Sequence, residues 1–132
     1  MCLSTVTKRY RKPSRQIRTG YKYLVRTMPC GEGWRLPFQW FNVESREDEV
    51  IFGKWYRARR EQGDTALSDD DKIYTLGFHC FKTLKGAKRW TARFNRPKLI
   101  VKVDVKGVHT HGTQDGVPVL VARWVRFHEP GK

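Results

Sequence analysis

The chain has 132 residues and a net charge of +14, from 27 lysines and arginines against 13 aspartates and glutamates. A hydrophobic content of 39%, with 13% aromatic residues, is enough for one modest core and excludes a globally disordered chain. No apolar run reaches the roughly 18 residues of a membrane-spanning helix, and the first residues lack the apolar segment of a secretory signal. Three scattered cysteines do not make a disulfide framework, so we expect a reducing, cytoplasmic setting.

The positive charge is concentrated in two intervals without acidic residues, one before Glu32 and one from Lys72 to Val103. The acidic residues are grouped instead at positions 44–49 and 61–71. This segregation predicts an electropositive face that attracts a polyanion such as RNA or DNA, with an ordinary solvated surface as the alternative. The cations that we expect at this face are Arg9, Arg11, Lys12, Arg15, Arg18, Lys82, Lys85, Lys88, Arg89, Arg93 and Arg96.

The first half of the chain predicts a basic arm followed by a folded domain. Residues 1–19 are polar and basic without periodicity, so we expect an arm that stays mobile until it binds, and a single domain over residues 20–132. Residues 21–28 alternate as a strand, 29–33 are rich in glycine and proline as in loops, and the aromatic segment 34–41 is irregular. Residues 50–57 are a second predicted strand with a bulge at Gly53, and the acidic run 68–71 is typical of a solvated loop.

Residues 74–90 predict a strand, a tight joint at Gly77 and then a basic amphipathic helix. Thr83 has the hydroxyl that caps a helix N-terminus, and Pro97 cannot continue a helix. Apolar positions recur at helical spacing and are expected to face the core, whereas lysines and arginines occupy the rest of the helix surface. The expected core positions of the helix are Leu84, Ala87, Trp90 or Thr91, and Phe94.

The last third of the chain predicts two more strands. Residues 99–106 and 117–127 carry alternating valines, and the segment 107–116 between them predicts a long hairpin loop with a turn at Asp115-Gly116. The fold class that follows is α+β, a mainly antiparallel twisted sheet of about five strands packed on one principal helix.

Two short motifs resemble known proteins. The opening Met1-Cys2-Leu3 and the Gly77-Phe78-His79-Cys80-Phe81 element before a short helix are similar to small phage-encoded proteins. This resemblance implies a phage accessory protein in the host cytoplasm that counters host defence by binding nucleic acid or a host ribonucleoprotein such as a CRISPR effector. A more distant likeness, to ADP-ribosyltransferase-type folds, implies a nucleotide or NAD-derived ligand, although the glutamate that this family needs late in the domain has no clear counterpart.

The histidines and cysteines leave several interpretations open. His79, Cys80, His109 and His111 offer nitrogen and sulfur ligands for zinc, but they lack Cys-x-x-Cys spacing, so we expect a buried Cys80, a hydrogen-bonded His79 and no metal or cofactor. A ligand pocket formed by Phe78, His79 and Phe81 at a sheet edge is the enzyme-like alternative. An N-terminal nucleophile at Cys2 is a further possibility, although a basic tail follows it.

Aromatic residues set among the cations favour nucleic acid as the partner. Trp55-Tyr56-Arg57 and Trp124-Val125-Arg126 combine rings that stack on bases with cations that neutralise phosphates. No known nucleic-acid-binding motif is present, so we expect a contact that tolerates different sequences. The protein alternative is a basic inhibitor that docks on an acidic host enzyme, because charge steers both kinds of encounter.

Overall fold

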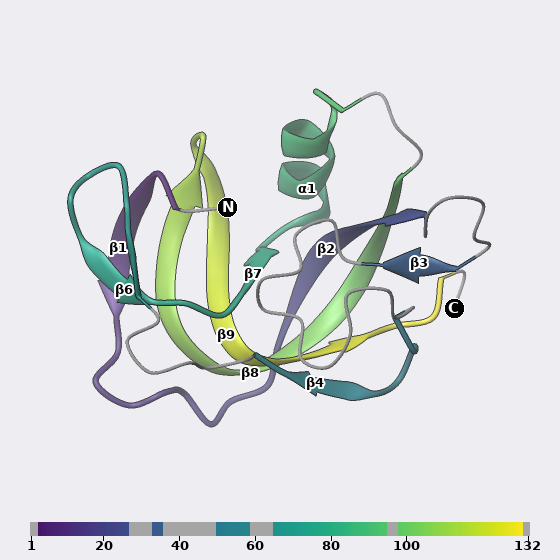
Figure 1. The fold of residues 1–132 in the computed structure, drawn as a ribbon, viewed down its shortest axis with the longest axis horizontal. Coiled ribbons are helices and arrows are strands. Elements are labelled where there is room, and N and C mark those ends of the chain that lie inside the picture. The colour runs from purple at the N-terminus through teal and green to yellow at the C-terminus, as the bar shows by residue number, and fades with distance from the viewer. Residues whose placement is uncertain (1–2, 27–32, 36–49, 59–64, 95–97, 131–132) are drawn as a thin grey trace.

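The computed structural model describes residues 3–26, 33–35, 50–58, 65–94 and 98–130 (Figure 1). The predictions for residues 29–32, 36–41 and 44–49, and for Cys2 and Arg96, therefore fall outside the described residues. Its elements are β1 (Thr5–Arg9), β2 (Arg18–Arg26), β3 (Trp34–Arg35), β4 (Trp55–Arg57), β5 (Thr65–Leu67), β6 (Ile73–Thr75), β7 (Phe78–Phe81), α1 (Leu84–Thr91), β8 (Lys98–Gln114) and β9 (Val117–Phe127). No helix in this described part is long and apolar enough to cross a membrane.

The main sheet is antiparallel and seven-stranded within the described residues, in the order β1-β8-β2-β7-β9-β4 with β3 beside β2. Because β8 also pairs with β9, the strands β8, β2, β7 and β9 form a closed ring of antiparallel pairs. β5 and β6 form a separate hairpin. The predicted antiparallel sheet is confirmed, but the fold is richer in strands than expected and its helix has only eight residues.

β8 is longer than its sequence pattern predicts. It continues through the predicted loop 107–116 as far as Gln114, so the prediction of a long loop is wrong and only the turn at Asp115-Gly116 is confirmed, with φ of 49° and 80°. Gly107 has a φ of 69°, and the β8–β9 register shifts between Val108 and Thr110. These irregularities bend the strand without ending it, and β8 and β9 curve together in Figure 1.

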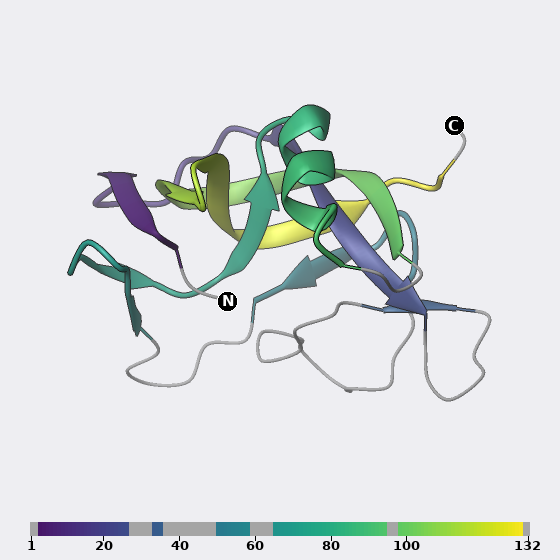
Figure 2. The ribbon, with the colours of Figure 1, turned by 90° about the horizontal axis from the view of Figure 1, so that it is seen from above.

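Two apolar clusters occupy the two faces of the curved sheet. The inner cluster takes residues from all four strands of the ring, with Leu24, Phe78, Val103 and Val125 among its buried members. The outer cluster lies between the sheet and α1, which stands on one side of the sheet in Figure 2. A strand ring with apolar side chains on both faces needs such a cover, because one face would otherwise meet water.

α1 begins where the sequence predicts, but it ends at Thr91, short of the predicted end before Pro97. The Thr83 side chain accepts a hydrogen bond of 2.9 Å from the Gly86 amide, as predicted for the N-cap. Ala87 and Trp90 are buried against the sheet, but the side chain of Leu84 is 40% exposed, so its predicted core position is wrong. The contact with the sheet is made by the later residues of this short helix, and Leu84 precedes it.

The predicted basic arm contains a strand. β1 pairs with the second half of β8, from Thr5 opposite Thr113 to Arg9 opposite Thr110, and Leu3 and Val6 are buried. The alternation that would reveal β1 is short, because only Val6 within β1 faces the core. The prediction of an unstructured arm is therefore wrong for these residues.

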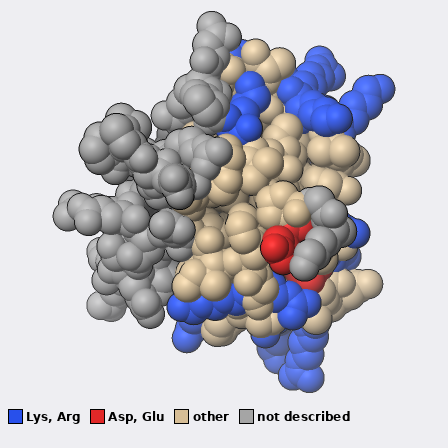
Figure 3. Space-filling model, turned by 90° about the vertical axis from the view of Figure 1, so that its right-hand side faces the viewer, with Lys and Arg blue, Asp and Glu red and all other residues tan. Residues whose placement is uncertain are grey.

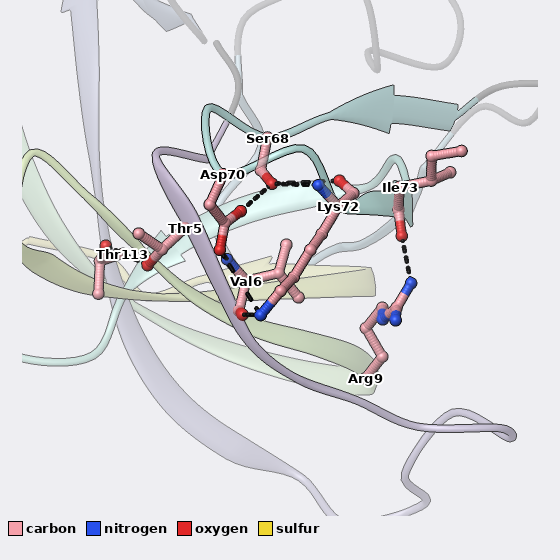
Figure 4. Close-up of polar contacts among 8 residues, drawn as sticks. All are labelled: Thr5, Val6, Arg9, Ser68, Asp70, Lys72, Ile73 and Thr113. Atoms are coloured by element: carbon pink, nitrogen blue, oxygen red, sulfur yellow. Dashed lines mark hydrogen bonds and ion pairs between the residues drawn. The ribbon is translucent and has the colours of Figure 1, made fainter.

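The turn between β5 and β6 holds β1 from its other side (Figure 4). The amides of Asp69 and Asp70 donate to the carbonyls of Leu3 and Ser4, both at 3.2 Å, and the Val6 amide donates to Asp70 Oδ2 at 3.4 Å. Lys72 Nζ donates to the Val6 carbonyl at 3.1 Å. The acidic run 68–71 is thus a structural clamp on β1.

The second predicted strand is shorter than expected. Residues 50–54 form an irregular segment with a turn, and β4 begins only at Trp55. Gly53 has a φ of 88° in this turn and does not form the predicted bulge within a strand. All three residues of β4 nevertheless pair with β9, and β4 is an edge strand of the described main sheet.

Candidate nucleic-acid interface

The cations that the sequence assigns to the electropositive face do not form one surface. Arg9 donates to the Ile73 carbonyl at 2.8 Å, and Arg93 pairs with Asp115 at 3.0 Å, so both have structural partners. Arg18 and Lys82 are half-buried. The remaining described members are exposed in two groups, on the loop after β1 and on α1, namely Arg11, Lys12, Arg15, Lys85, Lys88 and Arg89. Figure 3 shows one side of the molecule with basic atoms at its upper and lower margins and a small acidic spot.

A second group of cations lies among tryptophans on the sheet. The β4–β9 pairing sets Trp55 opposite Arg126 and Arg57 opposite Trp124, and the β9–β8 pairing sets Trp124 opposite Lys106. Since directly paired residues of an antiparallel sheet project to the same side, these five side chains share one face. We call Trp55, Arg57, Lys106, Trp124 and Arg126 the tryptophan–cation face.

Rings and cations alternate along the tryptophan–cation face. Lys106 Nζ lies 4.4 Å from the centroid of Trp55 and 4.9 Å from that of Trp124, so it is held between the two indoles. The guanidinium of Arg126 lies 4.7 Å from the centroid of Trp55, and that of Arg57 lies 5.7 Å from the centroid of Trp124. Each distance is within the roughly 6 Å over which an aromatic ring attracts a cation.

The two indoles of this face differ from the core indole of Trp90. Trp90 is 5% exposed, its Nε1 donates to Asp115 at 3.1 Å, and it packs on Phe81, as expected for a core residue. Trp55 and Trp124 are only partly buried. Large aromatic side chains that remain accessible beside cations are characteristic of binding surfaces.

Asp104 fixes one end of the tryptophan–cation face. It accepts from Arg126 at 2.7 Å and pairs with His128 at 2.9 Å. Burial raises the pKa of Asp104, but the hydrogen bonds from Arg126 and His128 outweigh burial and bring this pKa below its usual value. The carboxylate thus stays ionised and orients Arg126 over Trp55. Beside it is an open hollow of about 290 Å³, lined by Phe52, Gly53, Asp104, Arg126, Phe127, His128 and Glu129.

The predicted ligand pocket at Phe78, His79 and Phe81 is not at a sheet edge. β7 lies between β2 and β9, and these three side chains are 2%, 7% and 3% exposed. His79 has the predicted hydrogen bonds, to the Tyr74 hydroxyl and the Gly77 carbonyl, both at 3.1 Å. Burial lowers the pKa of His79 to about 3, so the imidazole is neutral. The motif therefore contributes buried side chains to the core.

The zinc interpretation finds no support in the geometry. Across the residues with a described placement, no group of three histidine, cysteine or acidic side chains is arranged to hold a metal ion. Cys80 is buried as predicted, and burial raises the pKa of its thiol to about 11, which keeps it protonated and unreactive. His109 and His111 lie in β8 rather than in a loop.

Sequence reasoning named the tryptophans of the tryptophan–cation face but missed Lys106. The strand pattern placed Lys106 on the polar side of β8, yet only the register between β8 and β9 brings it between the two indoles. No protein-family model, curated protein or solved structure matches the chain. The functional argument therefore depends on the geometry of the molecule itself.

Proposed function

We propose that this protein binds single-stranded nucleic acid, RNA or DNA, through the tryptophan–cation face. The observation that carries the proposal is the alternation of two accessible indoles with three cations across β4, β9 and β8. Proteins that bind single strands without sequence preference combine aromatic platforms for bases with cations for the backbone. The net charge of +14 supports this proposal, because it draws a polyanion toward the protein from a distance.

Each side chain of the face has a distinct role in this proposal. Bases stack on Trp55 and Trp124, while Arg57 and Lys106 neutralise the phosphates that flank the stacked bases. Arg126 is held by Asp104 and keeps the Trp55 ring oriented. The exposed lysines and arginines of α1 and of the loop after β1 add nonspecific attraction.

The setting that we propose follows from the phage resemblance. A phage accessory protein with this face acts on host nucleic acid directly, or on a ribonucleoprotein of host defence whose RNA it contacts. Pull-downs from host lysate with and without nuclease separate this proposal from docking on an acidic enzyme. Partners that are lost with nuclease support the proposal, and partners that survive it favour the protein inhibitor.

Fluorescence anisotropy with a labelled, mixed-sequence single strand tests the site. Arg57→Gln/Lys106→Gln removes two positive charges from the tryptophan–cation face, and Lys85→Gln/Lys88→Gln removes two from α1 as a control with the same charge change. We expect the first pair to weaken binding at least about tenfold more than the second, and to reduce the slope of log affinity against log salt by about 0.7 per lost phosphate contact.

Trp124→Leu tests stacking at constant charge. Loss of one stacked base costs about 1–3 kcal/mol, which corresponds to an affinity reduced about 5- to 150-fold. Equal effects of the two charge pairs, together with an unchanged affinity for Trp124→Leu, would show that binding is diffuse and that the tryptophan–cation face is structural.

A further inference from the structure

A second group of cations, separate from the tryptophan–cation face, lies around the pairing of β1 with β8. Lys8 in β1 is directly opposite His111 in β8. His111 is 8% exposed, and its Nε2 lies 3.0 Å from the Tyr10 hydroxyl. Lys8 Nζ lies 4.9 Å from the Tyr10 ring. A buried imidazole, a hydroxyl and an ammonium group are thus brought together where β1 ends.

β2 and β7 add two more cations to this group. Tyr21 is opposite Phe81, and the same antiparallel register places Gly20 beside Lys82. A Cβ at Gly20 would be tightly packed, 3.2 Å from the Cys80 Cβ and 3.1 Å from the Phe81 carbonyl oxygen, so β2 and β7 lie close together here. Arg18 lies on the same face of β2 as Gly20, two residues earlier.

The electrostatics show that these groups act on one another. Burial and, in decreasing order, the positive charges of Lys82, Arg18 and Lys8 together lower the pKa of His111 to about 4. Burial lowers the pKa of Lys82 as well, with a contribution from Arg18. The cation cluster therefore consists of Lys8, Arg18, Lys82 and His111, with Tyr10 as a hydroxyl donor or acceptor.

Lys8 is exposed and Arg18 and Lys82 are half-buried, and the described residues provide none of these three cations with an anionic partner. None of the ion pairs between described residues involves Lys8, Arg18 or Lys82. Arg18 Nε is buried and has no hydrogen-bond partner among the described residues. Lys22, the next cation along β2, is by contrast satisfied by the His79 carbonyl at 2.6 Å. Like charges and an unused guanidinium donor are costly in a partly buried position unless an anion neutralises them.

We propose that Lys8, Arg18, Lys82 and His111 form a binding site for a tetrahedral oxyanion, specifically a phosphate group. Arg18 supplies a donor in a fixed planar arrangement, Lys8 and Lys82 supply charge, and Tyr10 supplies a hydroxyl. The site is distinct from the tryptophan–cation face and goes beyond the proposed nucleic-acid binding. Its ligand is inorganic phosphate or the terminal phosphate of a nucleic-acid chain, which present the same chemistry.

The imidazole of His111 reports on occupancy of the site. A bound dianion offsets the charges of Lys8, Arg18 and Lys82, so it favours the protonated imidazole and raises the pKa of His111. Sulfate is the first probe, because its charge stays constant where the imidazole titrates. We expect sulfate to raise this pKa by about one unit or more in NMR titrations, compared with sodium chloride at equal ionic strength. By linkage, sulfate then binds more tightly as the pH falls from neutral.

Matched variants connect the response to the site. Arg18→Gln and Lys82→Gln should reduce the sulfate response at least about fivefold, whereas Lys102→Gln, an exposed charge on β8 outside the cluster, should leave it unchanged. Lys82→Arg keeps the charge and should retain the response, which separates lost binding from a damaged fold. An identical His111 titration in sulfate and in chloride, with a folded wild-type spectrum, overturns the proposal.

The two sources of phosphate are separated by two further probes. Inorganic phosphate and a 5′-phosphorylated single strand are each compared with the same strand ending in a 5′-hydroxyl. A His111 response to the phosphorylated strand alone identifies a chain-end site, and a response to inorganic phosphate identifies a free-ion site. Arg57→Gln/Lys106→Gln should keep the sulfate response while losing oligonucleotide affinity, so failure of one proposal is distinguishable from failure of the other.

Discussion

Gly77, just before β7, lies close to the backbone of β9. A Cβ at this position would lie 2.6 Å from the Ala122 carbonyl oxygen and 3.1 Å from His109 Nε2. Backbone cannot move away as a flexible side chain does, so the close approach of the Ala122 carbonyl to Gly77 depends on glycine. The joint therefore serves contact between strands rather than a left-handed turn.

We expect Gly77→Ala to lower the free energy of unfolding by about 1–3 kcal/mol, the usual cost of forcing extra atoms into a packed position. Urea denaturation measures this loss. Gly53→Asn is the control, because no atom lies within 4 Å of a Cβ there and asparagine tolerates the left-handed backbone. An equal loss in both variants would show that the contact with Ala122 is unimportant.

A chain of hydrogen bonds holds His79 neutral. The Leu3 amide donates to the Tyr74 hydroxyl at 2.9 Å, the hydroxyl lies 3.1 Å from His79 Nε2, and His79 Nδ1 lies 3.1 Å from the Gly77 carbonyl. A carbonyl can only accept, so Nδ1 carries the proton and donates to Gly77. Nε2 then accepts from the Tyr74 hydroxyl. The arrangement thus requires the uncharged imidazole.

Stability should therefore fall as the pH is lowered. The pKa of His79 is about 3 in the fold against an ordinary value of 6.5, so below pH 6.5 the unfolded chain takes up a proton that the fold excludes. Between pH 7 and pH 5 this costs about 2 kcal/mol. His111, with a pKa of about 4, acts in the same direction. Urea denaturation at both pH values should show that the free energy of unfolding falls less for His79→Gln than for the wild type. An equal fall in the two proteins would contradict a neutral His79 in the fold.

At the scale of elements, β1 is held by the β5–β6 turn as well as by β8. Asp70 accepts from the Ser68 hydroxyl and from the Val6 amide, and Lys72 pairs with it at 3.6 Å. The hydrogen bond from Ser68 lowers the pKa of Asp70 more than any other contribution does. The clamp is thus held by an ionised carboxylate.

Asp70→Ala should loosen β1 without unfolding the sheet. We expect faster amide hydrogen exchange at Val6, with exchange in the ring strands β7 and β9 unchanged, because the lost contacts are local. Asp71→Asn removes a neighbouring exposed carboxylate and is the control with the same charge change, because asparagine tolerates the φ of 62° at this position. Unchanged exchange at Val6 would assign the anchoring of β1 to β8 alone.

The sequence predicts elements well where burial alternates and poorly where it does not. The valines of residues 99–106 and 117–127 identified the first half of β8 and the whole of β9, because each of these segments has one face toward the core. The second half of β8 was missed because glycine, threonine and histidine are typical of loops, although His109 and His111 are in fact buried. The tryptophan–cation face could not be predicted from the sequence either, because the pairing of β4 with β9 joins residues about 70 positions apart.

The bend at Gly107 is a further feature of β8 that the sequence did not predict. Its φ of 69° permits the bend of β8, and an added Cβ would lie 3.0 Å from the Arg123 Cβ. We expect Gly107→Ala to lower the free energy of unfolding by about 1–2 kcal/mol, the cost of a left-handed backbone in a residue with a Cβ. Chemical denaturation measures it, and a neutral result would mean that the backbone can rotate out of this conformation.

For the whole molecule, the charge of +14 opposes folding as well as attracting anions. Like charges repel more in the compact state than in the extended chain, and salt screens this repulsion. We expect the melting temperature to rise between low and physiological sodium chloride concentrations. Lys12→Glu/Lys102→Glu, which reverses two exposed charges, should raise the low-salt melting temperature and flatten the salt dependence. A wild-type melting temperature that falls with salt would refute net repulsion.

The pairing of Thr5 with Thr113 sets the order in which the fold can be completed. β1 leaves the ribosome first among the strands, yet its partner segment of β8 is made more than a hundred residues later. Contacts this distant in sequence slow folding, because a long loop must close before they form. The β8–β9 hairpin is local and can form as soon as both strands are synthesised, so it provides the template onto which β1 docks. Until then the side chains of Leu3 and Val6, which are buried in the fold, are exposed to solvent. A chaperone that binds apolar segments therefore has the longest time to bind at this strand.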